Sequence, residues 1–222
     1  MKEVVWLENK IDEVFYPSDE NVLKDETDAY RQTFKYLLLS LEVFLSNNPD
    51  LNLDANIGVF YEERNLREFV CFDVVAMNNP RQEKRSSYCT WKDEFKPQVA
   101  FKILKEKNPT KSVNRLEVLK NVGVKEQYIF DPEYDFFPNG LIAYHLKNGE
   151  FEEIKINNSR IFSPALGLEI VDTDKMLRLF NPETREFLPT MEELTQQATK
   201  VETLESEIEQ LKAELAKLKR QN

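Results

Sequence analysis

The sequence has little of what several large protein classes require. It holds two cysteines in 222 residues, Cys71 and Cys89, without the density of a disulfide scaffold or the spacing of a metal knuckle, so we expect structural thiols. Five glycines and no glycine-rich phosphate loop exclude the common nucleotide-binding fingerprints. The one histidine, His145, has no ligand set around it, and we expect it to be structural. Serine nucleophile motifs are absent as well. Any catalysis must therefore depend on carboxylates and a metal.

Long apolar runs are also missing. No stretch approaches the roughly 20 apolar residues of a membrane-spanning helix. Residues 1–14 carry four acidic side chains, where a signal peptide has a basic region and an apolar core. We therefore expect a soluble, cytoplasmic protein. An apolar content of 41% in 222 residues is enough for one domain with a sizeable core, but a second full domain is not expected.

The net charge of −10 disfavours a chain that coats nucleic acid through bulk electrostatics, because phosphate binding needs a positive surface. A local reversal is hidden in this average. From Lys84 to Lys125 eleven Lys or Arg stand against four Asp or Glu. This segment predicts either a basic, phosphate-binding face or merely a solvated helix and loops rich in lysine.

Apolar spacing predicts a first helix that begins at an N-cap Thr27 and stops at Asn47. Short runs rich in Val, Phe and Tyr predict strands, a second helix ends at Gly123, and a loop is expected from Asn78 to Pro97. The order of helix, three strands, helix, strand and further strands favours a mixed α/β sheet flanked by helices. The expected strands are 56–63, 67–77, 99–104 and 126–132, then two or three among 140–146, 150–156 and 176–180.

The C-terminal residues show the pattern of a coiled coil. Thr190 and Glu193 predict a capping box at the start of a last helix. We expect a domain over 1–189 and a coiled-coil helix over 190–222 that forms a parallel homodimer. The alternative is that its apolar stripe packs back on its own domain. The stripe repeats in steps of three and four residues at Val201, Leu204, Ile208, Leu211, Leu215 and Leu218.

Asp73 is the most informative single residue. It lies inside the apolar run FVCFDVVAM, where alternation places it on the same face as Cys71 and Val75. A carboxylate there must be paired, solvated in a cleft or bound to a cation, because bare burial is costly. This argument is consistent with either role for Asp73, a structural ion pair or part of a functional site.

Several segments in this order resemble the Uma-two family of restriction-endonuclease-like proteins, a branch of the PD-(D/E)XK nuclease superfamily. The segments are YPSDENVLKDETDAYRQ, FDVVAM, SYCTWKDEFKPQVAFKIL, GVKEQYIFDPE, SPALGLEI and LFNPETREFL. The resemblance covers roughly Tyr16 to Glu193. It implies a restriction-endonuclease-like α/β core with added C-terminal strands, in which an Asp and a Glu on the next strand hold Mg²⁺ for hydrolysis of DNA phosphodiester bonds.

Site residues follow from the resemblance position by position. Asp73 matches the first carboxylate, but Lys102 stands where the family has Glu, and Arg115 where it has Lys. An ammonium in place of a ligand oxygen repels a cation, so a site with one carboxylate should hold Mg²⁺ poorly. We expect Asp73 and Lys102 to lie close together on adjacent strands as an ion pair. The family's His and its second Asp are also replaced, at Tyr30 and at Lys111 or Ser112.

Three functions remain in competition. The first is an endonuclease-family protein whose metal-dependent hydrolysis is lost or weakened and which acts as a binding or assembly module. The second is an active Mg²⁺-dependent DNA endonuclease that uses Asp73 with a relocated carboxylate such as Glu106 or Glu63. The third is an oligomeric scaffold without nucleic-acid contact.

Overall fold

The structure is a computed structural model that describes residues 27–46, 48, 50–78, 87–104, 115–174 and 176–221, with side chains up to residue 212. It is a mixed α/β fold with two sheets and three helices among these residues. None of the described helices is long and apolar enough to cross a membrane. The predicted α/β class with a C-terminal helix is therefore confirmed.

The larger sheet has seven strands in the order β3-β1-β2-β4-β5-β6-β7. β1 pairs parallel with β3, and β4 pairs parallel with β5, whereas the other neighbours are antiparallel. β2 and β4 therefore lie inside the sheet, with partners on both sides. The strands are β1 (Asn52–Phe60), β2 (Phe69–Asn78), β3 (Ser87–Cys89), β4 (Lys96–Ile103), β5 (Glu126–Phe130), β6 (Leu141–Lys147) and β7 (Glu150–Glu153).

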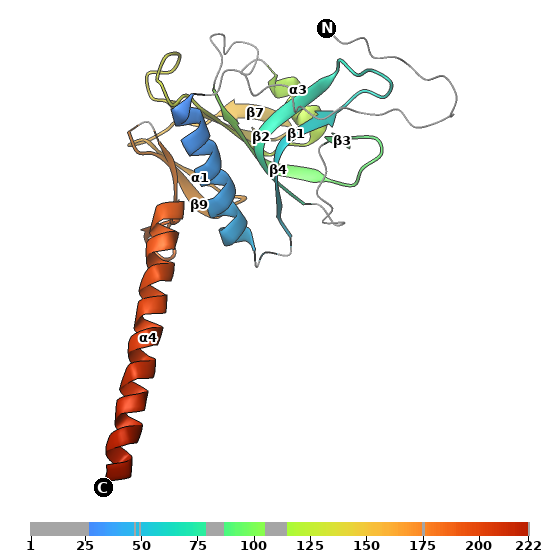
Figure 1. Ribbon diagram of the computed structural model, residues 1–222. Helices are drawn as coiled ribbons and strands as arrows, with labels where there is room; N and C mark the ends of the chain where they lie inside the picture. The colour runs from blue at the N-terminus through green and yellow to red at the C-terminus, as the bar shows by residue number, and fades with distance from the viewer. Residues whose placement is uncertain are drawn as a thin grey trace.

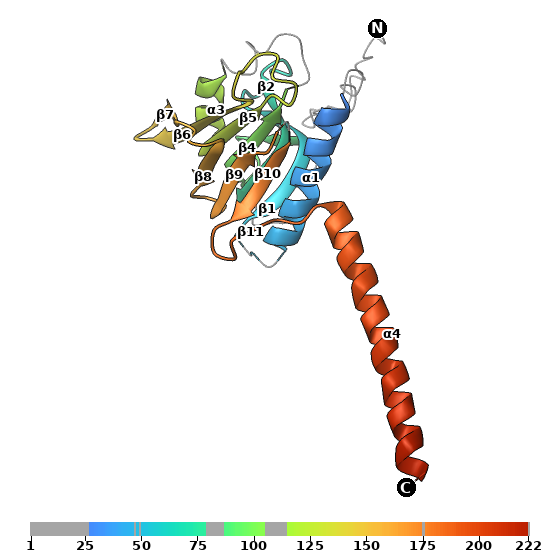
Figure 2. The same ribbon diagram turned by 90° about the vertical axis from the view of Figure 1, so that its left-hand side faces the viewer.

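The smaller sheet is an antiparallel meander in the order β11-β10-β9-β8. In Figure 2 it lies against the larger sheet, beside α1 (Asp28–Leu45). Its strands are β8 (Arg160–Ser163), β9 (Leu168–Asp172), β10 (Leu177–Asn181) and β11 (Glu186–Phe187).

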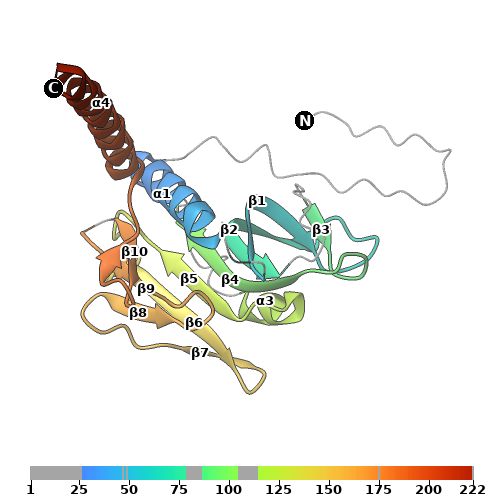
Figure 3. The same ribbon diagram turned by 90° about the horizontal axis from the view of Figure 1, so that it is seen from below.

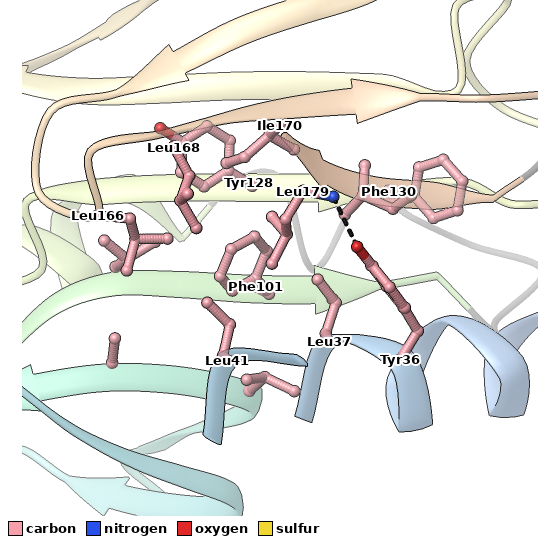
Figure 4. Packing of buried hydrophobic residues seen from close by; sticks show 14 of the residues in the cluster. Tyr36, Leu37, Leu41, Phe101, Tyr128, Phe130, Leu166, Leu168, Ile170 and Leu179 are labelled. Atoms are coloured by element: carbon pink, nitrogen blue, oxygen red, sulfur yellow. Dashed lines mark hydrogen bonds between the residues drawn. The ribbon is translucent and has the colours of Figure 1, made fainter. Parts of the chain in front are cut away.

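α1 forms because its apolar residues recur every three or four positions, and Thr27 accepts a hydrogen bond from the backbone N–H of Tyr30 at its start. Leu37 and Leu41 point from this helix toward Phe101 of β4, and side chains of the smaller sheet reach the same core (Figure 4). We call this the α1-side core. It joins α1, one face of the larger sheet and the smaller sheet, and its fully buried large residues include Tyr30, Leu37, Leu41, Phe101, Ile103, Tyr128, Phe130 and Leu168.

A second core lies around α3 (Leu116–Val122), which ends at Gly123 with a left-handed φ of +95°. Glycine adopts this conformation without steric cost, as predicted for that helix end. We call this the α3-side core. Its buried members are Ile57, Val59, Val70, Phe72, Val75, Met77, Tyr88, Ala100, Leu119, Val122 and Val124.

α4 (Met191–Gln221) starts beside α1 and extends away from the sheets (Figures 1 and 3). The predicted capping box is present: the Glu193 N–H donates to Thr190 Oγ1 over 3.2 Å, and the Thr190 N–H donates to Glu193 Oε2 over 2.6 Å. Arg178 of β10 also donates to Glu193 Oε2, over 3.2 Å. The start of α4 is thereby attached to the smaller sheet.

Two expectations about the strands are wrong. The segment expected as a loop, Asn78 to Pro97, includes β3 and the start of β4. The C-terminal part holds six strands where two or three further ones were expected, because β8, β9 and β11 are short and separated by turns. The apolar runs of these strands are too brief to separate from loops by pattern alone.

Candidate functional site

Asp73 lies in the middle of β2, with β1 on one side and β4 on the other. Strands on both sides and cores on both faces leave the residue only 4% exposed. Removing a carboxylate from water to this degree costs several kcal/mol unless partners compensate the charge. The contacts of Asp73 therefore decide what this position can do.

The side chains of β2 do not alternate evenly around Asp73. Members of the α3-side core occur at both even and odd positions of the strand, namely Val70, Phe72, Val75 and Met77. Regular alternation would place the first two and the last two on opposite faces. On β1, Asn56 stands opposite Asp73 between two regular pairs and has a left-handed φ of +52°. The regular alternation expected from the sequence for this part of β2 is therefore wrong.

Three donors surround the Asp73 carboxylate. The Lys102 Nζ lies 3.4 Å from Oδ1 and 3.3 Å from Oδ2. The backbone N–H of Ile103 donates to Oδ2 over 2.8 Å, and the Tyr30 hydroxyl donates to Oδ1 over 3.2 Å. The last regular pair of β2 and β4 at this end joins Val74 to Phe101, one residue after Asp73 in β2 and two residues before Ile103 in β4. The Asp73 side chain thus accepts a hydrogen bond from the backbone N–H of Ile103, which lies beyond the last regular pair.

The predicted ion pair between Asp73 and Lys102 is confirmed. The Lys102 side chain is 22% exposed and that of Asp73 is 6% exposed, so the lysine forms the solvent side of the pair. An ammonium, a hydroxyl and an amide already occupy both carboxylate oxygens. Mg²⁺ needs several oxygen ligands and is repelled by an ammonium as close to the carboxylate as Lys102 Nζ is. The described donor set does not fit Mg²⁺, and the described residues contain no group of three potential metal-ligating side chains.

Other predicted site residues lie elsewhere. Arg115, at the N-cap of α3, donates to the backbone carbonyl of Phe69 over 2.9 Å, at the start of β2, four residues before Asp73. Glu63 is exposed in the turn between β1 and β2. The structure connects neither side chain to the Asp73 carboxylate. Three further candidates, Glu106, Lys111 and Ser112, lie outside the described residues.

The contact from Tyr30 was not foreseen. The resemblance named Tyr30 only as the replacement of a histidine, yet its hydroxyl reaches Asp73 from the first turn of α1. One signal in the sequence could have indicated this contact. Tyr30 replaces a histidine of the family at the start of the helix, and tyrosine can also form a hydrogen bond. Tyr30, Asp73 and Lys102, from α1, β2 and β4, thus form one cluster.

A second buried polar network joins the two sheets. The Glu126 carboxylate accepts from the Tyr128 hydroxyl over 2.9 Å, from the Ser163 hydroxyl, and from the Ala165 N–H over 2.8 Å. The Tyr128 hydroxyl also lies 2.9 Å from His145 Nε2. Because the one hydroxyl proton of Tyr128 goes to Glu126, the Nε2–H of His145 donates to the Tyr128 oxygen. Each of these polar groups has a partner, which is consistent with the structural role expected for His145.

Burial sets the protonation of this network. Burial lowers the pKa of His145, and the nearby Glu126 charge opposes that effect in part. Burial and the Glu126 carboxylate raise the pKa of Tyr128 far above its usual range. Both side chains are therefore neutral at neutral pH. The network has the features of a structural element that links β5 and β6 to β8.

Comparison with known proteins supports the fold alone. No family model matches the chain, and no curated protein matches it either. The crystal structure of a protein from Anabaena variabilis, described as a putative nuclease belonging to DUF820, superposes with a TM-score of 0.51 at 10% identity. The match covers 68% of this chain and 81% of that one. DUF820 is a Uma-two-like family, so this chain has the fold of a nuclease-like protein of the kind that its sequence resembles.

Proposed function

We propose that this chain is a nuclease-fold protein in which metal-dependent phosphodiester hydrolysis is lost or strongly weakened, and which acts as a binding or assembly module. The observation that carries the proposal is the contact of Lys102 with both oxygens of Asp73, at 3.3 and 3.4 Å. The nuclease-like fold is what makes nucleic acid the first partner to test.

The chemical argument starts from what phosphodiester hydrolysis needs. Nuclease folds of this type use a divalent cation to generate the nucleophile and to stabilise charge on the phosphate. In this chain the Lys102 ammonium stands where the resemblance places the second carboxylate, and the Asp73 carboxylate accepts from Tyr30 and Ile103. A lysine supplies one positive charge, but it cannot coordinate water as a metal does. The cluster therefore neutralises Asp73, and among the described residues it leaves no carboxylate beside Asp73 to hold a metal that activates water.

Binding is supported by the basic stretch from Lys84 to Lys125, which holds seven more basic than acidic residues in an otherwise acidic chain. A local positive surface attracts phosphates even when the net charge is negative. Such binding depends on salt, because counterions are released from the nucleic acid. A mobility-shift titration at low and high salt tests this part, and absence of any shift at low salt would favour a scaffold without nucleic-acid contact.

The catalytic part is tested by restoring the second carboxylate. Lys102→Glu should create a metal site, so that Mn²⁺ or Mg²⁺ stabilises the variant against thermal unfolding, by about 2.7 kcal/mol at a concentration about 100-fold above its dissociation constant. Wild type should show no such gain. Lys96→Glu is the matched control, because Lys96 is an exposed lysine of the same strand and its substitution makes the same change in charge. Asp73→Ala added to Lys102→Glu should remove the gain.

Plasmid nicking with Mg²⁺ and Mn²⁺, and with chelator as the blank, measures activity directly. We expect the wild type to remain at the level of the chelator blank. Clear nicking by the wild type that Asp73→Ala abolishes would overturn the proposal in favour of an active enzyme with a relocated carboxylate. The metal-induced stability of the Lys102 variant is the firmer expectation, because binding needs fewer correctly placed groups than cutting does.

A further inference from the structure

α4 extends away from the rest of the domain (Figures 1 and 2). It carries an exposed apolar stripe. At 31 residues the helix is about 46 Å long. Four large apolar side chains of the stripe are about half exposed or more: Val201 (53%), Leu204 (47%), Ile208 (50%) and Leu211 (61%). A helix in a protein gains most of its stability when its apolar face packs against another surface. We therefore expect another helix or surface to cover this stripe. These four side chains, the described part of the stripe, are not packed on their own domain, which is the alternative that the sequence left open.

We propose that α4 pairs with α4 of a second copy of this chain as a parallel, two-stranded coiled coil. Val201 and Ile208 occupy successive a positions of a heptad repeat, and Leu204 and Leu211 occupy the d positions. β-branched residues at a with leucine at d favour two parallel strands. The sequence continues the repeat with leucine at positions 215 and 218, whose side chains lie outside the described residues.

The charges that flank the stripe select the parallel orientation. In a parallel pair each g residue meets the e residue five positions further along the other chain. Lys200 then meets Glu205, and Glu207 meets Lys212, both opposite in sign. An antiparallel pair that buries the same stripe would place Glu207 of one chain against Glu207 of the other, and Lys212 against Lys212. Both contacts would join like charges. Charge complementarity therefore identifies a second copy, in parallel orientation, as the occupant of this face.

The base of α4 determines what such a pair does to the domains. The Tyr36 hydroxyl donates to the Leu188 carbonyl over 3.1 Å, the Ser40 hydroxyl donates to the Pro189 carbonyl over 2.9 Å, and Arg178 also donates to Leu188. These bonds hold the segment before α4 on α1 and β10. Parallel pairing therefore places both domains at the same end of the coiled coil. This inference does not depend on the chemistry at Asp73.

Oligomeric mass tests the interface. The 222-residue chain should sediment as a dimer of 26.2 kDa chains at micromolar concentration. The double substitution Leu204→Asp and Leu211→Asp should make it monomeric, because two of the three d layers, 204, 211 and 218, then carry a charge. The matched control, Ser206→Asp with Gln210→Asp, adds the same two charges at positions f and c, away from the stripe, and should remain dimeric. Circular dichroism of the domain's thermal transition verifies that the variants fold.

Orientation is tested by exchanging charges. In a parallel dimer, Glu207→Lys places a lysine opposite Lys212 of the other chain. The dissociation constant should rise roughly ten-fold, because two symmetric pairs change from attraction to repulsion. Adding Lys212→Glu restores opposite charges and should recover the wild-type value. In an antiparallel dimer both substitutions only replace one like-charged contact by another, so unchanged affinity would overturn the parallel arrangement. A monomeric wild type, or a dimer that survives the stripe substitutions, would overturn the interface itself.

Discussion

Replacing Asp73 by Asn, Lys102 by Met, and both together measures the energy of the ion pair in solution. At 3.3 Å and an effective dielectric constant of about 20, the two charges attract by about 5 kcal/mol before desolvation. The desolvation of a carboxylate that is 6% exposed offsets much of this. The net value of the pair is therefore small, whereas the cost of leaving one partner alone is large.

The single variants differ because their environments differ. Breaking a buried pair costs about 3–5 kcal/mol. Asp73→Asn should cost about 3 kcal/mol, the lower end of this range, because Lys102 is 22% exposed and can turn toward water. Lys102→Met should cost about 2 kcal/mol, because Asp73 keeps the Tyr30 hydroxyl and the Ile103 N–H as donors. The double variant leaves neither charge alone and should cost only about 1 kcal/mol, less than either single variant, which gives a coupling energy of about 4 kcal/mol.

Urea unfolding followed by tryptophan fluorescence provides these free energies. Both tryptophans of the chain precede α3, so the signal does not come from α4. The exposed pair of Lys147 and Glu152, at 3.3 Å with side chains 51% and 56% exposed, is the control, and its coupling should stay below about 1 kcal/mol. If the costs at Asp73 and Lys102 add within about 0.5 kcal/mol, the two residues do not interact, and the argument for a self-neutralised site fails.

Two further predictions concern the buried polar groups. Because burial lowers the pKa of His145, the unfolded chain takes up a proton first as pH falls below about 6.5, so the free energy of unfolding should decrease between about pH 7 and 5. It should level off below the folded pKa, and His145→Gln should flatten the decrease; an equal slope in the variant would exclude His145 as its source. Tyr36→Phe removes a hydroxyl that accepts from the Leu179 N–H over 3.0 Å (Figure 4) and donates to Leu188, and should cost about 2 kcal/mol in urea unfolding. A cost below about 0.5 kcal/mol would show that water replaces these bonds.

The elements with long, regular patterns could be predicted from the sequence. α1 was expected from its apolar spacing and Thr27 cap, and the structure has it from Asp28 to Leu45. The capping box of α4 and the glycine end of α3 were also foreseen, since each is a local signal within a few residues. The smaller sheet was largely missed. Its strands have two to five residues, and they are stable only because they pack on α1 and on the larger sheet, which no local pattern contains.

The candidate site was foreseen in part. Asp73 and Lys102 were paired through a resemblance, and an antiparallel pairing of β2 with β4 brings them together. The Tyr30 hydroxyl was not foreseen as a donor, because its position depends on how α1 lies across the sheet. The bond from the Ile103 N–H depends on where the ladder ends. Arg115 was named through the resemblance, because it stands where the family has a lysine, and its side chain donates to the carbonyl of Phe69.

The three residues of the cluster compensate one another. A carboxylate at the position of Asp73 needs positive charge and hydrogen bonds whether or not a metal supplies them. Lys102 supplies the charge, Tyr30 and the Ile103 N–H supply the hydrogen bonds, and β2 can therefore keep an acidic residue between two cores. For the same reason Lys102→Glu alone should restore metal binding more readily than cutting. It returns a second carboxylate, but Tyr30 and Ile103 still donate to Asp73, and no described group is placed to activate water.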